Sequence, residues 1–452
     1  MKNITTNTIR FLIYVLFYSH AYAQDVKHLS LQEAINTGVA NSKQLKAANA
    51  GIEAASWHIR ELNNIKLPEI NASGAYMRML QPSFDLKIPL PGSNPQDTSS
   101  NMGQGAKALK VNQMMYASVN ASLPLFSGFR IRNGIEAAQL LKRATELDAD
   151  KDKDKVILNI IASYYNLYKA QSAIKLLNEN LKQAQSRVKD FTNLEKNGLL
   201  ARNDLMKAEL QQSNVELTIA EAENNLKVSQ YSINLLLGLP ENTVLELENA
   251  GPPSLTQLQP LEEWQKTAIA SRADLLALQT RQQAASKNTE SIKGEYYPSV
   301  ALTGGYIAGY IPNILTLANA ANIGIGLSYN ISSLYKTGTK VKQAKAQEQQ
   351  LYWNNLQAQD GIRVQVVKAY EDYNQAMQKI TLYEKAVDQA NENYRITKNK
   401  FDNSLETTTN LLDADVLQLQ ARLNYEFAKA DAVIAYNKLA ETAGTIEKQS
   451  LK

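Results

Sequence analysis

The sequence predicts a mainly α-helical fold with a smaller β part that needs strands from other chains to close. Three observations predict it: an internal duplication, two alternating segments in each half, and very long stretches without proline. The chain has 452 residues, 44% of them apolar and 20% charged, and no cysteine. The missing cysteine excludes disulfides, cysteine-ligated zinc and thiol catalysis. The mean hydropathy of −0.35 is too polar for a bundle of membrane helices, so membrane insertion would require a β-barrel.

The N-terminal segment, residues 1–23, has the features of a secretory signal peptide. Lys2 and Arg10 make its start basic, residues 11–18 form an apolar run, and residues 21–23 read Ala-Tyr-Ala, a typical cleavage site. The run is far shorter than the roughly 20 residues that a membrane-spanning helix needs. We therefore expect an exported protein that is not lipidated, because no N-terminal cysteine is available. Removing the segment lowers the formal net charge from +4 to +2, since 46 bases then face 44 acids. That charge gives no reason to expect nucleic-acid binding.

The remaining chain is a duplication with one long insertion. Residues 31–76 match residues 261–306 at a constant offset of 230, and residues 156–238 match residues 362–444 at an offset of 206. The offset falls by 24 between the two stretches, so the first half carries about that many extra residues. Residues 81–105 are rich in Pro, Ser, Gly and Asn, which marks them as the inserted loop.

These matches divide the chain into a signal peptide, two repeats, a connecting segment and a tail. The first repeat covers residues 24–238, the linker or equatorial segment 239–260, the second repeat 261–444 and the tail 445–452. Each repeat runs helix, strand, strand, long helix, helix. Strands are expected at about 67–80, 107–126, 297–311 and 322–333, and long helices at about 130–196 and 337–400.

The strand-like segments alternate between apolar and polar or small residues. In residues 323–331 every second residue is Ile, Leu or Tyr, and residues 117–123 follow the same period of two. This pattern suits a barrel strand with lipid outside and water inside. The alternative is an edge of a soluble sandwich. Two strands per half give only four per chain, too few to close a barrel, so the strands need partners from other chains.

The long helices are too long for one globule. Residues 130–196 contain no proline and a single glycine, Gly134. A helix of these 67 residues would span about 100 Å. Residues 156–181 carry one apolar stripe, and a second stripe flanks it, which predicts neighbours on two sides, as in a wall of helices. The shorter helices, residues 31–64 and 203–237, together match the length of one long helix.

Four motifs in this order carry a resemblance to a known family. They are Leu-Ser-Leu-Gln-Glu-Ala at 29–34, Leu-Pro-Leu-Phe-Ser-Gly at 123–128, Asn-Gly-Leu-Leu-Ala-Arg-Asn-Asp-Leu at 197–205 and Leu-Leu-Leu-Gly-Leu-Pro at 235–240. Across essentially the whole mature chain, the sequence resembles the TolC-like outer-membrane efflux proteins. The resemblance implies a homotrimer with a twelve-stranded outer-membrane β-barrel and a twelve-helix α-barrel in the periplasm of a Gram-negative bacterium.

The resemblance also implies a passive, porin-like duct without cofactors. An inner-membrane transporter would supply the energy, and a periplasmic adaptor would join it to the tip of the tunnel. In the family, a Gly-Leu pair at a helix–helix turn meets the adaptor. That pair corresponds to Gly198 and Leu199 here, and to Ser404 and Leu405 in the second half. The alternative is that both turns are ordinary helix ends.

The family closes its tunnel mouth with inward acidic residues and polar links. The matching positions here are Asp413 and Asp204, while Asn410 replaces a second acid, Glu406 replaces an arginine and Phe401 replaces a tyrosine. These departures put the usual salt links of the closed mouth in doubt. A ring of three Asp413 carboxylates would attract cations and repel anions. The alternative for Asp413 is a solvated helix face, and for Asp204 a charge that complements a helix dipole.

Other function classes have less support in the sequence. An enzyme is not expected, because the mature chain has only His28 and His58 and no placed nucleophile and base. Asp150, Asp152 and Asp154 alternate with lysines and fan around a helix, which favours a solvated face over a metal site. A coiled-coil adhesin stalk would not need the alternating strands. Type I protein secretion and metal efflux stay open within the duct hypothesis, since the substrate is set by the pump.

Overall fold

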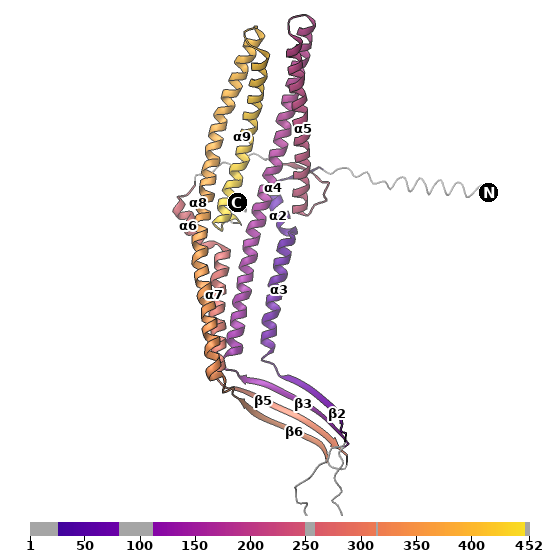
Figure 1. Ribbon diagram of the computed structural model, residues 1–452, viewed down its shortest axis with the longest axis vertical. Coiled ribbons are helices and arrows are strands. Elements are labelled where there is room, and N and C mark those ends of the chain that lie inside the picture. The colour runs from indigo at the N-terminus through magenta and orange to yellow at the C-terminus, as the bar shows by residue number, and fades with distance from the viewer. Residues whose placement is uncertain (1–25, 81–111, 249–257, 313–314, 448–452) are drawn as a thin grey trace, which may run out of the picture. The chain divides into compact units, whose positions relative to one another are not determined.

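The computed structural model describes residues 26–80, 112–248, 258–312 and 315–447 (Figure 1). The signal peptide and the inserted loop at 81–105 lie outside the described residues. The first half contains β1 (Val26–Leu29), α2 (Leu31–Asn41), α3 (Lys43–Asn64), β2 (Glu69–Arg78), β3 (Gln113–Phe126), α4 (Arg130–Lys196) and α5 (Arg202–Leu237). The second contains β4 (Val244–Leu247), α6 (Leu261–Ser271), α7 (Ala273–Lys293), η1 (Gly294–Tyr296), β5 (Ser299–Ile311), β6 (Leu315–Ser328), α8 (Ser333–Asp402) and α9 (Thr408–Thr442).

The element order confirms the predicted duplication of helix, strand, strand, long helix and helix. The compact units of the structure divide the chain differently. One unit comprises residues 1–51, 145–277 and 355–452, and the other comprises residues 52–144 and 278–354. Each unit therefore takes residues from both repeats. We call them the helical unit and the sheet unit and describe each by itself.

The first helix of each half is interrupted, whereas the sequence predicted one continuous helix over residues 31–64. Ser42 leaves the helical region (φ −55°, ψ 116°) between α2 and α3, and Arg272 does so (φ −64°, ψ 121°) between α6 and α7. The Ser42 hydroxyl accepts a hydrogen bond from the backbone N–H of Leu45 at 3.3 Å, so it caps the second segment.

The second strand of the second half also differs from its predicted bounds of 322–333. β6 covers Leu315–Ser328, and α8 begins at Ser333 rather than at residue 337. Asn330 ends the strand, because its Oδ1 accepts hydrogen bonds from the N–H and the hydroxyl of Ser332. At the other end, Asn319 has φ +55° and the β5–β6 register shifts between Ile307 and Gly309, which breaks the alternation that sequence reading relies on.

The sheet unit contains an antiparallel sheet with strand order β2-β3-β5-β6 (Figure 1). The register places large apolar residues on one face, which we call the apolar face. Its members include Ile70, Ala72, Tyr76, Met115, Val119, Leu123, Leu302, Tyr306, Tyr310, Ile323, Ile325 and Leu327. The opposite face carries Asn71, Ser73, Ser118, Asn120, Thr303 and Asn322. The predicted two-sided alternation is confirmed. Ile323 is 82% exposed, so nothing in the described chain covers its side of the sheet.

A close backbone approach in the sheet unit explains the glycine of the motif at 123–128. Gly128 has φ +62°, and a Cβ there would lie 2.2 Å from the carbonyl oxygen of Gly294. Gly294 is equally tight, since its own Cβ would lie 2.4 Å from the carbonyl oxygen of Gly128. The chain thus turns from β3 into α4 against the end of α7, at a point where neither position has room for a side chain.

The helical unit has its core along the predicted apolar stripe of α4. The largest fully buried side chains of this core include Leu29, Ile157, Ile160, Ile161, Tyr164, Leu167, Ile233, Leu237 and Leu245. Two of them belong to β1 and β4, which form a parallel pair that the sequence did not predict. The hydroxyl of Tyr164 donates to the carbonyls of Leu29 and Glu248, at 3.2 and 3.1 Å, and so ties α4 to both strands. No helix in the described part of the chain is long and apolar enough to cross a membrane.

Candidate functional site

The two helix–helix turns of the helical unit have the same backbone geometry. Gly198 has φ +73° and Ser404 has φ +59°, the left-handed conformation that ends many helices. The backbone N–H of Leu199 bonds the carbonyl of Leu194, and that of Leu405 bonds the carbonyl of Lys400, both at 2.8 Å. A Cβ on Gly198 would meet nothing within 4 Å, so the positive φ alone favours glycine there.

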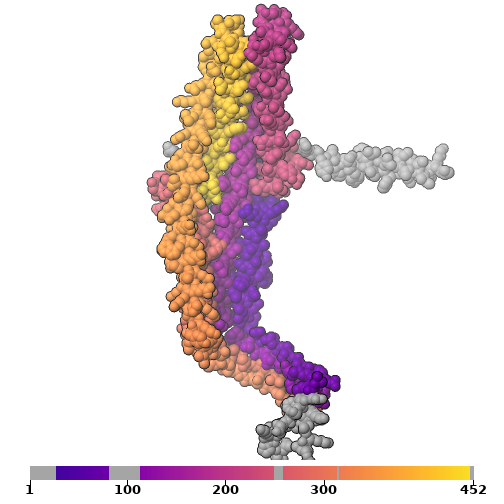
Figure 2. All heavy atoms as spheres, viewed as in Figure 1, coloured from indigo at the N-terminus to yellow at the C-terminus, as the bar shows by residue number. Residues whose placement is uncertain are grey.

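Each turn presents one leucine to solvent. Leu199 is 74% exposed and Leu405 is 76% exposed. The turns lie at the ends of the hairpins formed by α4 and α5 and by α8 and α9 (Figure 1). Helices α5 and α9 lie side by side, as the adjoining magenta and yellow atoms in Figure 2 show. The structure therefore brings the four predicted docking residues to the ends of two hairpins that belong to one unit.

A polar cavity of about 750 Å³ lies between the two turns, lined by residues of all four helices and both turns. Its main cross-hairpin contact is made by Lys207 on α5. The Lys207 Nζ lies 3.3 Å from Asp204 Oδ1 and 3.1 Å from the hydroxyl of Thr409 at the start of α9. Asp204 therefore lies in the first turn of α5 and also forms an ion pair with Lys207. Because Lys207 contacts Thr409 as well, it links the two hairpins at their ends.

The remaining predicted gate residues lie at the start of α9. Glu406 precedes Thr407, the residue that caps α9, so it lies just outside the helix. Asn410 and Asp413 are three residues apart within α9, on successive turns of one face. Glu406 Oε1 accepts a hydrogen bond from Asn410 Nδ2 at 2.6 Å and one from the N–H of Thr407 at 3.0 Å. The bond from Asn410, and then that from Thr407, lowers the pKa of Glu406.

Asp413 lies one turn further along α9 than Asn410. Its side chain is exposed, and no cation of the described chain lies within 4 Å of it. Phe401, which replaces the family's tyrosine, packs its ring 5.3 Å from that of Phe191 in a cluster with Leu205 and Leu411. The structure thus brings Glu406 and Asn410 into contact, links Asp204 to α9 through a lysine, and leaves Asp413 unpaired.

A buried ion pair, which sequence reasoning missed, joins the two hairpins deeper in the helical unit. Arg187 on α4 is 8% exposed and Asp415 on α9 is fully buried. The guanidinium Nη1 and Nη2 each lie 3.1 Å from a different oxygen of the carboxylate. Asn180 adds Nδ2 at 3.3 Å from both oxygens, and Arg187 Nη2 also donates to the hydroxyl of Tyr394 on α8 at 3.4 Å. Three helices therefore meet at one bidentate pair.

Asp415 keeps the buried guanidinium of Arg187 in its charged form. Burial alone would lower the pKa of Arg187, but the hydrogen bond and the charge of Asp415 outweigh burial and raise it. A signal was present in the sequence, because Arg187 interrupts an apolar helical row between Ala184 and Phe191, both of which are buried. A charge inside such a row marks a buried partner elsewhere in the chain.

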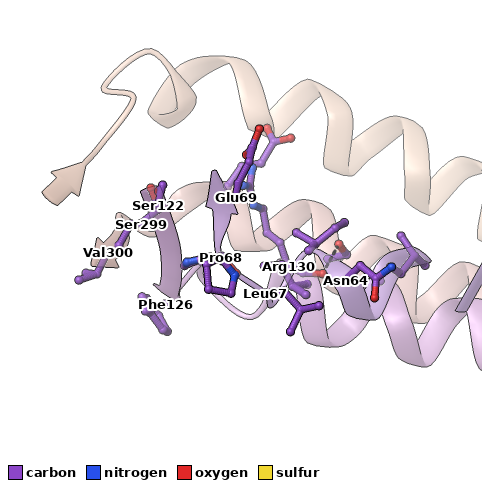
Figure 3. A pocket seen from close by; sticks show the side chains of 18 of the residues that line it. Asn64, Leu67, Pro68, Glu69, Ser122, Phe126, Arg130, Ser299 and Val300 are labelled. Carbon is purple, nitrogen blue, oxygen red and sulfur yellow. Dashed lines mark hydrogen bonds between the residues drawn. The ribbon is translucent and has the colours of Figure 1, made fainter. Parts of the chain in front are cut away.

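Two other cavities contain charged groups but no predicted site residue. In the sheet unit, a cavity of about 1060 Å³ lies where β2 and β3 meet α3 and α4. Figure 3 shows Glu69 and Arg130 there beside Leu67, Pro68 and Phe126. In the helical unit, a cavity of about 380 Å³ is lined mostly by charged side chains. They are Lys151, Asp154, Lys155, Arg272, Asp274, Lys438 and Glu441, and the polar Gln365 lies among them.

Asp154 in the second of these cavities titrates abnormally. Burial first, and then the charges of Glu447, Glu441 and Asp150, raise the pKa of its carboxyl to about 7, against a smaller opposing effect of Lys153. In the described residues, no group of three or more His, Cys, Asp or Glu side chains is arranged to hold a metal ion. The cavity therefore has a carboxyl that stays partly protonated near neutral pH.

Comparison with known proteins gives a consistent answer. The family model described as "Outer membrane efflux protein" matches residues 34–239 and 264–445. The outer membrane efflux protein BepC of Brucella suis biovar 1 (strain 1330) is 22% identical over 77% of this chain and 70% of its own length. Nodulation protein T of Rhizobium leguminosarum bv. viciae is 26% identical over 47% of this chain and 45% of its own length. The solved structure of the outer-membrane channel OprN superposes with a TM-score of 0.74 at 19% identity, over 92% of this chain and 90% of that one.

Removal of one partner of the buried pair should strongly destabilise the protein. Asp415→Ala leaves the guanidinium of Arg187 buried without a counter-charge, which typically costs about 3–5 kcal/mol. We expect a lower midpoint of thermal unfolding for the purified protein in detergent. The double variant Arg187→Met/Asp415→Leu removes both charges and should recover most of the loss. A double variant as unstable as the single one would contradict the role of the ion pair.

Stability should also depend on pH through Asp154. The folded pKa lies above that of the unfolded chain, so the folded state holds an extra proton and loses stability as pH rises from about 4 to about 7. Asp154→Asn removes this loss, so the variant should unfold at a higher temperature than wild type at about pH 8, and the difference should shrink toward pH 5. The control Asp388→Asn, on the exposed surface of α8, should show no such trend.

Proposed function

Because the chain belongs to the outer membrane efflux protein family, we propose that it is the outer-membrane exit duct of a tripartite efflux pump. It conducts substrates passively from an inner-membrane transporter, through a periplasmic adaptor, across the outer membrane of a Gram-negative bacterium. The observation that carries this proposal is the family match over both repeats, together with a sheet whose apolar face has no cover in the described chain. The family and its structural neighbours are channels rather than enzymes.

Assembly into a homotrimer is supported by the surfaces that one chain leaves unpaired. β2 and β6 form the two edges of the four-stranded sheet in the described residues. Helix α5 carries a row of exposed apolar side chains at helical spacing: Met206, Leu210, Leu217, Val228, Tyr231 and Leu235. A ring of identical chains would pair each edge with the next chain and cover each such row. The number three comes from the family resemblance.

Export and orientation complete the proposal. The signal peptide at residues 1–23 directs the chain out of the cytoplasm, and the barrel strands rather than a lipid hold it in the membrane. The helical unit then extends into the periplasm, with Gly198, Leu199, Ser404 and Leu405 as the adaptor contact. The two exposed leucines are suitable contacts, because removing their apolar surface from water on binding is favourable.

The channel mouth would owe its ion preference to Asp413. This residue is exposed and has no counter-ion in the described chain, while Glu406 is engaged by Asn410 and Asp204 by Lys207. Three symmetry-related Asp413 carboxylates at a narrow opening would be the groups most available to passing ions.

The substitution Asp413→Asn tests this function and the gate together. Wild-type protein in a planar lipid bilayer should form cation-selective channels that divalent cations block. The variant should still conduct, but it should lose most of its selectivity for cations and be blocked less by divalent cations, since a neutral amide replaces each charge. The measurements are the reversal potential in a salt gradient and the current with added magnesium.

A matched control removes an exposed acid of α5 by Glu209→Gln, which should leave selectivity unchanged. Unchanged selectivity in Asp413→Asn would refute the acidic ring but leave the duct intact. Wild-type protein that forms no channels, or that salt without detergent extracts from membranes, would refute the duct itself.

The docking surface is tested by Leu199→Asp/Leu405→Asp. Both side chains are exposed and make no core contacts, so the variant should still reach the outer membrane as a trimer. It should nevertheless lose efflux, because a charge replaces each apolar anchor of the adaptor contact. The readout is the susceptibility of a deletion strain, complemented by each variant, to a panel of toxic compounds. Gln389→Asp is the control, since it adds a negative charge at an exposed position of α8 away from the turn and should preserve efflux.

A further inference from the structure

In the second half of the sheet unit, a long uncharged segment is followed directly by a cluster of lysines. Residues 299–335, which include β5, β6 and the first residues of α8, contain no charged side chain. Four lysines then follow within ten residues, at positions 336, 340, 342 and 345, and the next acid is Glu348. A long uncharged stretch that ends in a block of cations is typical of a segment leaving a membrane.

Exposed apolar side chains continue from β6 into the first turn of α8. Ile323, Ile325 and Leu327 lie on this face of the sheet. Beyond it, Ile331 is 70% exposed, and Leu334 and Tyr335 in the first turn of α8 are 59% and 71% exposed. Figure 1 shows β6 leading into α8 at one end of the sheet. Two large apolar side chains at the start of α8 are therefore exposed, as are those of the neighbouring strand.

Two of the four lysines lie below these side chains on the same face of the helix. At 100° per residue, Lys342 follows Tyr335 by seven residues, and Lys345 follows Leu334 by eleven, so each pair lies within about 20° around the axis. Lys342 is about 10 Å further along the helix than Tyr335. Lysine side chains lean toward the helix N-terminus, that is, back toward the sheet. Their ammonium groups would then lie toward the outer side of a headgroup layer, roughly 5–8 Å thick, that begins at the level of Tyr335.

These two lysines are also free to bind an anion. Both are exposed, and in the described part of the chain no carboxylate lies within 4 Å of either. Lys340, on another side of the helix, is instead held by both carboxylate oxygens of Glu295, at 3.0 and 2.8 Å. In the first half the positions corresponding to Lys342 and Lys345 are Glu136 and Gln139, so α4 has no such cations. Glu136 itself accepts from Arg132 at 3.0 Å and from Lys287 at 2.6 Å.

We propose that Tyr335, Lys342 and Lys345 form a docking surface for the headgroup of an anionic phospholipid in the periplasmic leaflet of the outer membrane. This inference rests on the proposed function, because it requires the sheet to lie in that membrane. The tyrosine ring lies at the boundary between tails and headgroups, where aromatic side chains are enriched, and the two ammonium groups contact the phosphate. The asymmetry between the repeats means that each chain has one such site, on α8 and not on α4.

The test uses purified full-length protein in detergent and fluorescent phosphatidylglycerol as the probe. Lys342→Gln/Lys345→Gln should weaken the apparent Kd by about fivefold for each lysine removed, and added salt should weaken wild-type binding further. Lys379→Gln/Lys385→Gln is the control, because it removes two exposed cations of the same helix far from the sheet. That control should bind the lipid as wild type does. Phosphatidylethanolamine should not compete in any of the three proteins.

Each outcome decides the inference. Equal loss of binding in both double variants would mean that only net charge matters, and would overturn the site. Displacement of the lipid by millimolar inorganic phosphate would assign the lysines to a free anion and overturn the lipid assignment. Channel conductance of the same preparations separates the two proposals. A variant that conducts and binds phosphatidylglycerol like wild type refutes the lipid site alone, whereas a wild type without conductance refutes the duct.

Discussion

The structure depends on a sheet that one chain cannot complete. Its four strands expose an apolar face that includes Ile323 and Leu327, and they leave β2 and β6 as unpaired edges in the described residues. A four-stranded sheet of this kind is unstable in water and open to pairing at both edges. Burial in lipid and pairing with identical chains remove both problems at once. The matched helix lengths, 67 and 70 residues for α4 and α8 and 36 and 35 for α5 and α9, fit chains that repeat around one axis.

Much of this architecture could be predicted from the sequence because its signals are local. The alternation over residues 323–331 gives the two faces of β6, and the absence of proline over residues 130–196 gives α4 with its observed bounds. Gly198 indicates a turn that needs a positive φ. Ser404 could be matched to Gly198 only through the internal repeat, since a serine alone does not indicate a positive φ.

What could not be predicted depends on contacts between distant residues. The pair of β1 with β4 joins segments more than 200 residues apart, and four residues of each are too few to carry a periodic signal. Arg187 and Asp415 belong to different repeats, and the sequence around either residue does not indicate which residue it pairs with. Asn319, by contrast, shows a local failure, because its positive φ interrupts the alternation that would otherwise have revealed the first half of β6.

Two polar links join the hairpins, one at the turns and one deeper in the helical unit, and they differ in strength. At the turns, Lys207 contacts Asp204 and Thr409 in partly exposed surroundings, where an ion pair contributes less than about 1 kcal/mol. Deeper in the unit, Arg187 and Asp415 are buried and bidentate, so separating them strands a charge at a cost of about 3–5 kcal/mol. A movement that parts the hairpins only on the turn side of Arg187 must separate the cluster of Phe191, Phe401 and Leu411, but it leaves the buried charge pair intact. Glu406, Asn410 and Asp413, the residues of the proposed gate, lie on the turn side of this buried charge pair.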